Sequence, residues 1–172
     1  MIIIKIRTEQ PSDYDKVESL VKTSFATNDD DDATTHEYLN ELRAKDVFIP
    51  ELSLVAEKDG EVIGQVVLYK TDITTPTGKH TELVLSPICV HPNYFRQGVA
   101  RAIIDEVLQK AKDMGFGAVF LCGDPVIYSK LGFVPSYRYN IFHKSDAKAE
   151  WSMVCELYNG ALEGISGTVN TI

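Results

Sequence analysis

The sequence predicts an α/β (α+β) fold in which a mixed sheet carries helices on both faces. Three observations support this prediction. The chain has 172 residues, of which 44% are hydrophobic and 24% are charged, as expected for a single globular domain. Runs of β-branched and aromatic residues alternate with segments of helical spacing. In chain order these segments give β-α-α-β-β-β-α-β-α-β-β, which is typical of helices packed on a mixed sheet.

The first 44 residues predict one strand and two helices. Residues 2–7 are rich in isoleucine and predict the strand. Residues 11–13 begin a helix, and residues 28–32 predict a loop because their like charges repel each other. The second helix is expected over residues 35–44. The apolar positions of the first helix recur at helical spacing and are Tyr14, Val17, Leu20, Val21 and Phe25.

A β-hairpin is expected next. Residues 52–58 and 61–71 are β-type runs joined by Asp59-Gly60, and this dipeptide suits a type I′ turn because both turn residues need a positive φ. Residues 72–79 predict a second turn. Residues 82–90 predict another strand, although Pro87 lies inside it. Because proline has no N–H for the ladder, the strand needs an edge or a bulge at that point.

The second half begins with a long helix over residues 98–114, followed by Gly115 at the position that favours a left-handed residue. A short buried strand over 118–122 and a short helix over 123–131 follow. The last two strands are expected at 137–143 and 150–158. The sequence therefore predicts one domain over residues 1–158 and a short, irregular C-terminal tail over 159–172.

Composition excludes several functional classes. The net charge of −8 disfavours non-specific binding to nucleic acid or to anionic membranes, but suits cationic substrates. The three cysteines are far apart and form neither a disulfide framework nor a zinc site, so we expect no metal. No apolar stretch approaches the roughly 20 residues of a membrane span, and the first residues are too short for a signal peptide. We therefore expect a protein of the reducing cytoplasm.

The most informative segment is residues 85–101, where a strand leads through a short loop into a long amphipathic helix. Gly98 and Ala100 allow a ligand to approach the backbone closely. The first helical turn offers unpaired N–H groups and the positive end of the helix dipole, which suit phosphate, and Arg96 and Arg101 add positive charge. The loop lacks the P-loop and dinucleotide patterns. The alternative is an ordinary strand–loop–helix connection.

These residues resemble a known family. The run ICVHPNYFRQGVA at 88–100 resembles the acetyl-CoA motif of the GCN5-related N-acetyltransferases (GNAT), whose two small positions are matched by Gly98 and Ala100. Phe95 stands where the family usually has Gln or Arg, so one side-chain contact to phosphate is missing. The run YSKLGF at 128–133 is similar to the family's Tyr-x-x-x-Gly-Phe segment.

The resemblance extends from about residue 4 to residue 158, and the run at 123–135 looks most like the YhbS-type branch. It implies the GNAT-like acyl-CoA N-acyltransferase fold, with a mostly antiparallel sheet of six to seven strands that splays between strands 4 and 5. Pro87 offers a local reason for the splay, because it interrupts the ladder.

The resemblance also implies acetyl-CoA as co-substrate and a direct attack by an amine on the thioester. Tyr128 would protonate the leaving thiolate. The backbone of the strand would pair with the pantetheine arm and face the thioester oxygen, and the loop amides would hold the diphosphate. The implied strand residues are Ile88, Cys89 and Val90, and the implied loop residues are Arg96, Gln97, Gly98, Val99, Ala100 and Arg101.

The general base is left open between Glu82 and a water chain, and a solvated glutamate at a strand edge is the alternative for Glu82. His80 and His91 receive no role. We expect Cys122 to pack in the core rather than to carry the acetyl group in a covalent intermediate. The acidic run at 28–32 is either a solvated loop or a means of steering a cationic amine.

Two functional classes remain. The first is an N-acetyltransferase whose acceptor is a small-molecule amine or an amine of a peptide or protein. The second is a non-catalytic acyl-CoA-binding or regulatory module on the same fold. An unrelated phosphate-binding enzyme is disfavoured, because other phosphate motifs are absent from the sequence. An exposed final strand would allow a homodimer.

Overall fold

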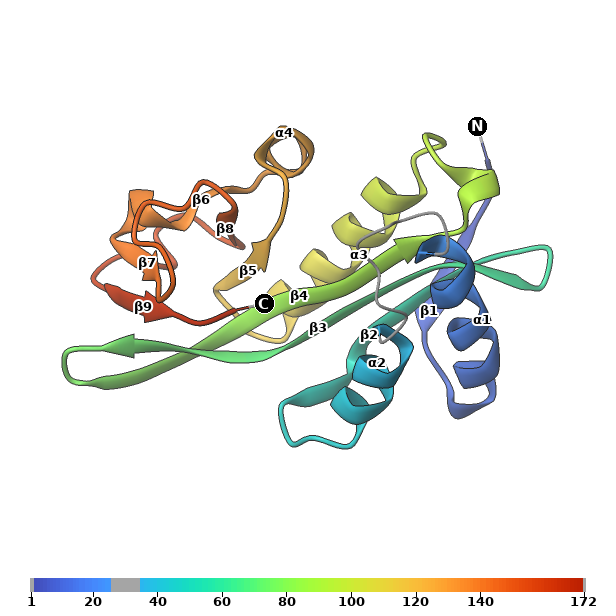
Figure 1. Ribbon diagram of the computed structural model, residues 1–172, viewed down its shortest axis with the longest axis horizontal. Helices are drawn as coiled ribbons and strands as arrows, with labels where there is room; N and C mark the ends of the chain where they lie inside the picture. The colour runs from blue at the N-terminus through green and yellow to red at the C-terminus, as the bar shows by residue number, and fades with distance from the viewer. Residues whose placement is uncertain (1, 26–34, 172) are drawn as a thin grey trace. The chain divides into compact units, whose positions relative to one another are not determined.

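The computed structural model describes residues 2–25 and 35–171, so the acidic run at 28–32 lies outside the described residues (Figure 1). The chain forms two compact units. Unit 1 comprises Met1–Leu68 and Pro87–Val107, and unit 2 comprises Tyr69–Ser86 and Leu108–Ile172. In the described ranges, no helix is long and apolar enough to cross a membrane.

Unit 1 is built on strands that follow one another in the chain. Its elements are β1 (Lys5–Thr8), α1 (Tyr14–Phe25), α2 (Thr35–Arg43), β2 (Phe48–Lys58), the first part of β3 (Glu61–Thr75), the end of β4 (Gly78–Val90) and most of α3 (Val99–Asp113). β1 and β2 are antiparallel, with Lys5 opposite Glu57. Asp59 and Gly60 have φ values of 52° and 80°, as the sequence predicts for this hairpin turn.

Helices cover both faces of the unit 1 strands. A Cβ atom at Gly64 of β3 would lie 3.2 Å from Cγ1 of Val99, so this face meets the first turn of α3. On the other face, the Ser53 hydroxyl of β2 donates to Glu9 at 3.1 Å, and Glu9 pairs with Arg43 of α2 at 2.6 Å. This ion pair therefore attaches α2 to the face opposite α3.

A second ion pair fixes the entry to α1. The Arg7 guanidinium of β1 donates to both oxygens of Asp13, at 2.7 and 2.9 Å, and to Glu57 at 2.9 Å. The Arg7 hydrogen bonds lower the pKa of Asp13 below its ordinary value. The Asp13 side chain is 5% exposed, so this bidentate pair is better shielded from solvent than a surface salt bridge.

Unit 2 centres on β5 (Ala118–Cys122) and β8 (Ser152–Glu156), which pair antiparallel over all five residues. Leu83 and Val84 of β4 pair in parallel with Val119 and Phe120 of β5. The remaining elements are α4 (Pro125–Tyr128), β6 (Val134–Pro135), β7 (Ile141–His143) and β9 (Gly167–Val169). The mixed α/β class is therefore confirmed.

The described residues form nine strands, which is more than the six to seven expected, because three of the strands are short. The expected strand at 137–143 is wrong in its first part, since Ser136–Tyr139 is a 3₁₀ helix and Asn140 is left-handed with φ 59°.

The expectation of an irregular tail is also wrong, because β9 pairs in parallel with β7 and buries Val169. β6 pairs with β8, so the final predicted strand is not an open edge along Met153 and Val154.

The β3–β4 hairpin is longer than predicted and contains a change of register. Near its tip, the Thr81 hydroxyl donates to Asp72 at 2.8 Å, so these side chains lie on one face. At its other end, the N–H of His91 donates to the carbonyl of Ile63 at 2.8 Å. Between these two contacts, the chain advances one residue further along β4 (from 81 to 91) than along β3 (from 63 to 72). β4 therefore has an extra residue between 81 and 91, a β-bulge in the interval that contains Pro87.

Candidate functional site

The loop from β4 to α3 has a backbone suited to an anion. Arg96 and Gly98 have positive φ values of 61° and 84°, whereas Gln97 between them does not. Alternating residues of this kind turn successive N–H groups toward a common concavity. Gly98 accepts the first helical hydrogen bond from Ala102 at 3.0 Å, so α3 begins directly after it. The N–H groups of the first turn then have no acceptor within the helix.

A small cavity lies at this loop. It has a volume of about 140 Å³ and is lined by Val90, residues 94–96 and residues 98–101. Its size suits a phosphate group rather than a whole nucleotide, and the loop's N–H groups and the helix dipole favour negative charge. Five of the six predicted loop residues therefore line one cavity, whereas Gln97 does not line it and instead donates from its side chain to the carbonyl of Asn93 at 3.1 Å. Phe95 is 51% exposed and supplies an apolar side chain where a phosphate contact was missing from the sequence pattern.

The segment before this loop is held by α1. The hydroxyl of Ser24 in the last turn of α1 donates to the carbonyl of Val90 at 3.0 Å. Cys89 is buried, and burial raises the pKa of its thiol to about 12, so the thiol is unreactive at neutral pH. The backbone of Ile88, Cys89 and Val90 follows or includes the bulge, where regular pairing is disturbed.

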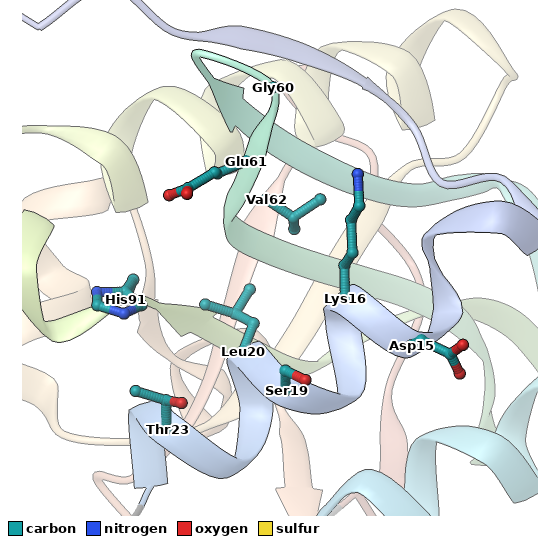
Figure 2. Close-up of a pocket in the computed structure, with 9 residues that line it drawn as sticks. All are labelled: Asp15, Lys16, Ser19, Leu20, Thr23, Gly60, Glu61, Val62 and His91. Atoms are coloured by element: carbon teal, nitrogen blue, oxygen red, sulfur yellow. The ribbon is translucent and has the colours of Figure 1, made fainter.

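His91 has a structural role. Its Nδ1 accepts from the N–H of Asn93 at 3.1 Å and caps the 3₁₀ helix Pro92–Tyr94. In the neutral ring the proton therefore resides on Nε2. His91 lines one end of a cleft of about 410 Å³. Figure 2 shows it with Leu20 of α1 on one side and Glu61, the first residue of β3, on the other.

Tyr128 ends α4 in unit 2. Asp124 caps this helix by accepting from the N–H of Val126 at 2.9 Å, and the Tyr128 ring meets Phe133 edge-on at 6.1 Å between centroids. A Cβ atom at Gly123 would lie only 2.7 Å from Cδ2 of Tyr128, so the ring lies directly against the backbone at the end of β5. Burial raises the pKa of Tyr128, so the phenol stays protonated at neutral pH.

Glu82 is 4% exposed, so the expectation of a solvated glutamate at a strand edge is wrong. One of its oxygens accepts from the N–H of Gly117 at 2.9 Å, and the other lies 3.0 Å from Nε2 of His80. Burial of this polar side chain is tolerated because both of its oxygens have hydrogen-bond partners. His80, 40% exposed in its side chain, connects this buried carboxylate to solvent.

The remaining cysteines show no activating base among the described residues. The Cys122 sulfur lies 3.3 Å from Oγ1 of Thr171, and burial raises the pKa of this thiol. Cys89, Cys122 and Cys155 are all free. Among the residues that the structure describes, no cluster of three or more His, Cys, Asp or Glu side chains is arranged to hold a metal ion.

Two residues of unit 1 were not singled out by the sequence. One is Ser24, whose contact with Val90 joins segments far apart in the chain. The other is Gln65, whose buried amide has no hydrogen-bond partner among the described residues. Neither residue can be recognised from a periodic sequence pattern, because each stands out only by its contacts, or lack of contacts, in the folded structure.

Comparison with known proteins gives consistent matches. The chain matches the family model of the acetyltransferase (GNAT) domain over residues 5–136. It is 32% identical over 166 residues to the uncharacterized N-acetyltransferase YhbS of Escherichia coli strain K12, covering 95% of this chain and 93% of that protein. It is also 33% identical over 85 residues to human N-acetyltransferase 8, covering 46% of this chain and 37% of that protein.

Solved structures agree with the sequence matches. The crystal structure of Escherichia coli YhbS in complex with CoA superposes with a TM-score of 0.85 and 26% identity, covering 100% of this chain and 91% of that chain. A GNAT family acetyltransferase from Brucella melitensis in complex with acetyl-CoA superposes with a TM-score of 0.78, 22% identity and coverage of 100% and 97%. At 22% identity, the second likeness concerns the fold alone.

Proposed function

The chain belongs to the GNAT acetyltransferase family, and on that premise we propose that it is a cytoplasmic, acetyl-CoA-dependent N-acetyltransferase acting on a primary amine. The carrying observation is the phosphate loop, where Arg96 and Gly98 adopt positive φ immediately before a helix. This arrangement suits the diphosphate of coenzyme A. The CoA held by the related YhbS structure supports the same donor. The three free cysteines are consistent with a reducing compartment.

In the proposed reaction, the amine nitrogen attacks the thioester carbonyl carbon, a C–N bond forms and the C–S bond breaks. The backbone of Ile88, Cys89 and Val90 pairs with the pantetheine arm and faces the carbonyl oxygen, where one donor contributes roughly 3–4 kcal/mol. The loop amides of residues 96–101 hold the diphosphate. The site needs no metal for these steps.

Tyr128 is the proposed acid that protonates the leaving thiolate. Burial raises the pKa of Tyr128, which keeps the proton in place at neutral pH. The pKa values of an unperturbed phenol and thiol differ by only about 1.5, and burial of Tyr128 widens this difference. Replacing Tyr128 by Phe removes the proton and keeps the ring. We expect kcat to fall by about 100-fold or more while the affinity for acetyl-CoA stays within threefold. An unchanged kcat would show that another group supplies the proton.

Glu82 is the candidate base, with the exposed His80 ring as its connection to solvent. Glu82→Gln is a sharp test, because glutamine can accept from Gly117 and donate to His80 and so preserves both contacts. If Glu82 takes the amine proton, the variant folds normally but loses most of its turnover at neutral pH. Full turnover would leave a water chain as the base.

The proposed acceptor is a small-molecule amine or an amine of a peptide or protein. The deciding experiment measures free thiol released from acetyl-CoA in the presence of separate amine classes: peptide N-termini, lysine, polyamines and aminoglycosides. Amine-dependent release with one class supports the transferase. Tight binding of acetyl-CoA without release by any amine supports the second candidate, a non-catalytic acyl-CoA-binding module, which Phe95 in the phosphate loop favours.

A further inference from the structure

The side-chain amide of Gln65 is anomalous in the core of unit 1. Gln65 is fully buried, and neither its Oε1 nor its Nε2 has a hydrogen-bond partner among the described residues. Buried amides are almost always hydrogen-bonded, because an unpaired amide loses its hydrogen bonds to water and gains none in the protein. Leucine at this position would avoid the penalty. The unpaired amide therefore points to a partner that arrives with a ligand.

The face of the sheet that Gln65 occupies follows from alternation along β3. The Cβ position of Gly64 faces α3, so Gln65, the next residue, points to the opposite face. Cys89 of the neighbouring strand β4 also points to that face, because its thiol contacts the hydroxyl of Ser24 in α1. Gln65 and Cys89 therefore share a face on adjacent strands, and Cys89 lies beneath the end of α1.

This face of the sheet lies next to the backbone of residues 88–90, where the proposed reaction places the acyl group. Ser24 donates to the carbonyl of Val90 at 3.0 Å, and α1 ends one residue later at Phe25. α1 therefore ends beside the segment Ile88–Val90. A group bound next to the thioester on the α1 side would meet one buried polar side chain of β3 that lacks a hydrogen-bond partner among the described residues. This side chain is the amide of Gln65.

The surroundings limit the chemistry of that group. Burial raises the pKa of Cys89 to about 12, which marks a layer that disfavours charge. An amide offers one acceptor and two donor hydrogens. A neutral group that both donates and accepts, such as a hydroxyl or a carboxamide, satisfies it, whereas a carboxylate or an ammonium ion brings an uncompensated charge.

We propose that Gln65 is a specificity-determining residue for the acceptor and that its amide hydrogen-bonds a hydroxyl or carboxamide carried beside the reacting amine. This inference rests on the proposed N-acetyltransferase function. It predicts that the enzyme distinguishes isosteric amines with and without such a group. An apolar analogue would leave the amide of Gln65 without a hydrogen-bond partner and would therefore bind less favourably.

The test compares thiol release with ethanolamine against propylamine, and with glycinamide against isobutylamine. In the wild type, the polar member of at least one pair is preferred at least tenfold in kcat/KM. Gln65→Leu reduces that preference to within threefold and leaves acetyl-CoA affinity unchanged. Gln65→His retains one donor and one acceptor and restores part of the preference. An internal water as the sole partner of the amide predicts no change in preference, which overturns the proposal.

Thermal unfolding without ligand gives a readout independent of turnover. Gln65→Leu removes an unpaired buried amide, so the midpoint rises by a few degrees. The matched control is Ser53→Ala, on β2 and also buried, whose hydroxyl has a partner in Glu9. Its midpoint falls, and its amine preference is unchanged. A fall for Gln65→Leu equal to that of Ser53→Ala refutes the proposal. Absence of turnover with any amine in the wild type refutes instead the proposed function beneath it.

Discussion

The contact between Gly123 and Tyr128 permits a test of the proposed acid that leaves its hydroxyl intact. Gly123 has no left-handed backbone, so alanine is conformationally acceptable there. A Cβ atom would nevertheless lie 2.7 Å from Cδ2 of Tyr128. Carbon atoms pack at about 3.5–4.0 Å, so the ring must move by about 1 Å. A displacement of this size at a reacting group costs up to about 100-fold in rate.

We therefore expect Gly123→Ala to lower kcat by about 10- to 100-fold at saturating acetyl-CoA and amine, measured by thiol release. Overpacking also lowers the free energy of unfolding by about 1–3 kcal/mol, measured by urea denaturation. The affinity for acetyl-CoA, measured by calorimetry, stays within threefold. In the double variant Gly123→Ala with Tyr128→Phe, kcat equals that of Tyr128→Phe alone, because the displaced ring no longer carries the proton.

The control is Gly164→Ala in unit 2. Gly164 has φ +78° and nothing within 4 Å of a Cβ atom, so alanine costs about 1–2 kcal/mol of stability through its backbone alone. Its kcat is expected to remain unchanged. The reasoning fails if Gly123→Ala retains full kcat, or if adding it to Tyr128→Phe lowers kcat further.

Two further predictions concern unit 1. Gly98 has φ +84° with open space around a Cβ atom, so Gly98→Ala strains the phosphate loop without a clash; we expect CoA affinity to fall about tenfold, measured by calorimetry, and stability to fall by about 1 kcal/mol. Asp13 has a folded-state pKa below its unfolded value, so its stabilising effect is full above about pH 4 and is lost as pH falls through the folded pKa. Asp13→Asn should therefore reduce the free energy of unfolding at pH 7 by about 1–3 kcal/mol and have a progressively smaller effect as the pH falls through the folded-state pKa of Asp13, measured by urea denaturation.

Local chemistry explains which elements were predictable. The Asp59-Gly60 turn was predicted because two adjacent positive φ angles strongly restrict the residues, and both angles are observed. The long helix was predicted within one residue at each end, because a glycine lies directly before α3 and another ends it. By contrast, β7 and β9 depend on each other across more than 20 residues of chain. Neither has an alternating pattern long enough to predict a strand.

The same distinction applies to the site. The phosphate loop was accessible from the sequence because its glycine and helix start are local features. Glu82 is a candidate base by sequence, but its burial was not predictable, because it depends on Gly117 and His80, which the sequence does not place beside it. Gln65 was hidden more completely. Its importance lies in a hydrogen bond that is missing, and a missing contact can be recognised only when the neighbours are known.

The charges of the chain are divided unequally between the units. By sequence, unit 1 carries nine Lys and Arg against 17 Asp and Glu, whereas unit 2 carries eight of each. The whole net charge of −8 therefore belongs to unit 1 and attracts ammonium ions by long-range steering. The layer around Cys89 in the same unit disfavours charge. An amine moving from the acidic surface to that layer has its pKa lowered by desolvation, which favours the neutral, nucleophilic form.

Desolvation and a carboxylate base leave different signatures in the pH dependence of kcat/KM. If Glu82 removes the proton, Glu82→Gln abolishes the rise of kcat/KM with pH that the wild type shows. If desolvation supplies the neutral amine, the rise remains in Glu82→Gln and its midpoint follows the pKa of each acceptor amine tested. Two acceptors of different basicity are enough to separate the routes, because a base on the protein gives both the same midpoint.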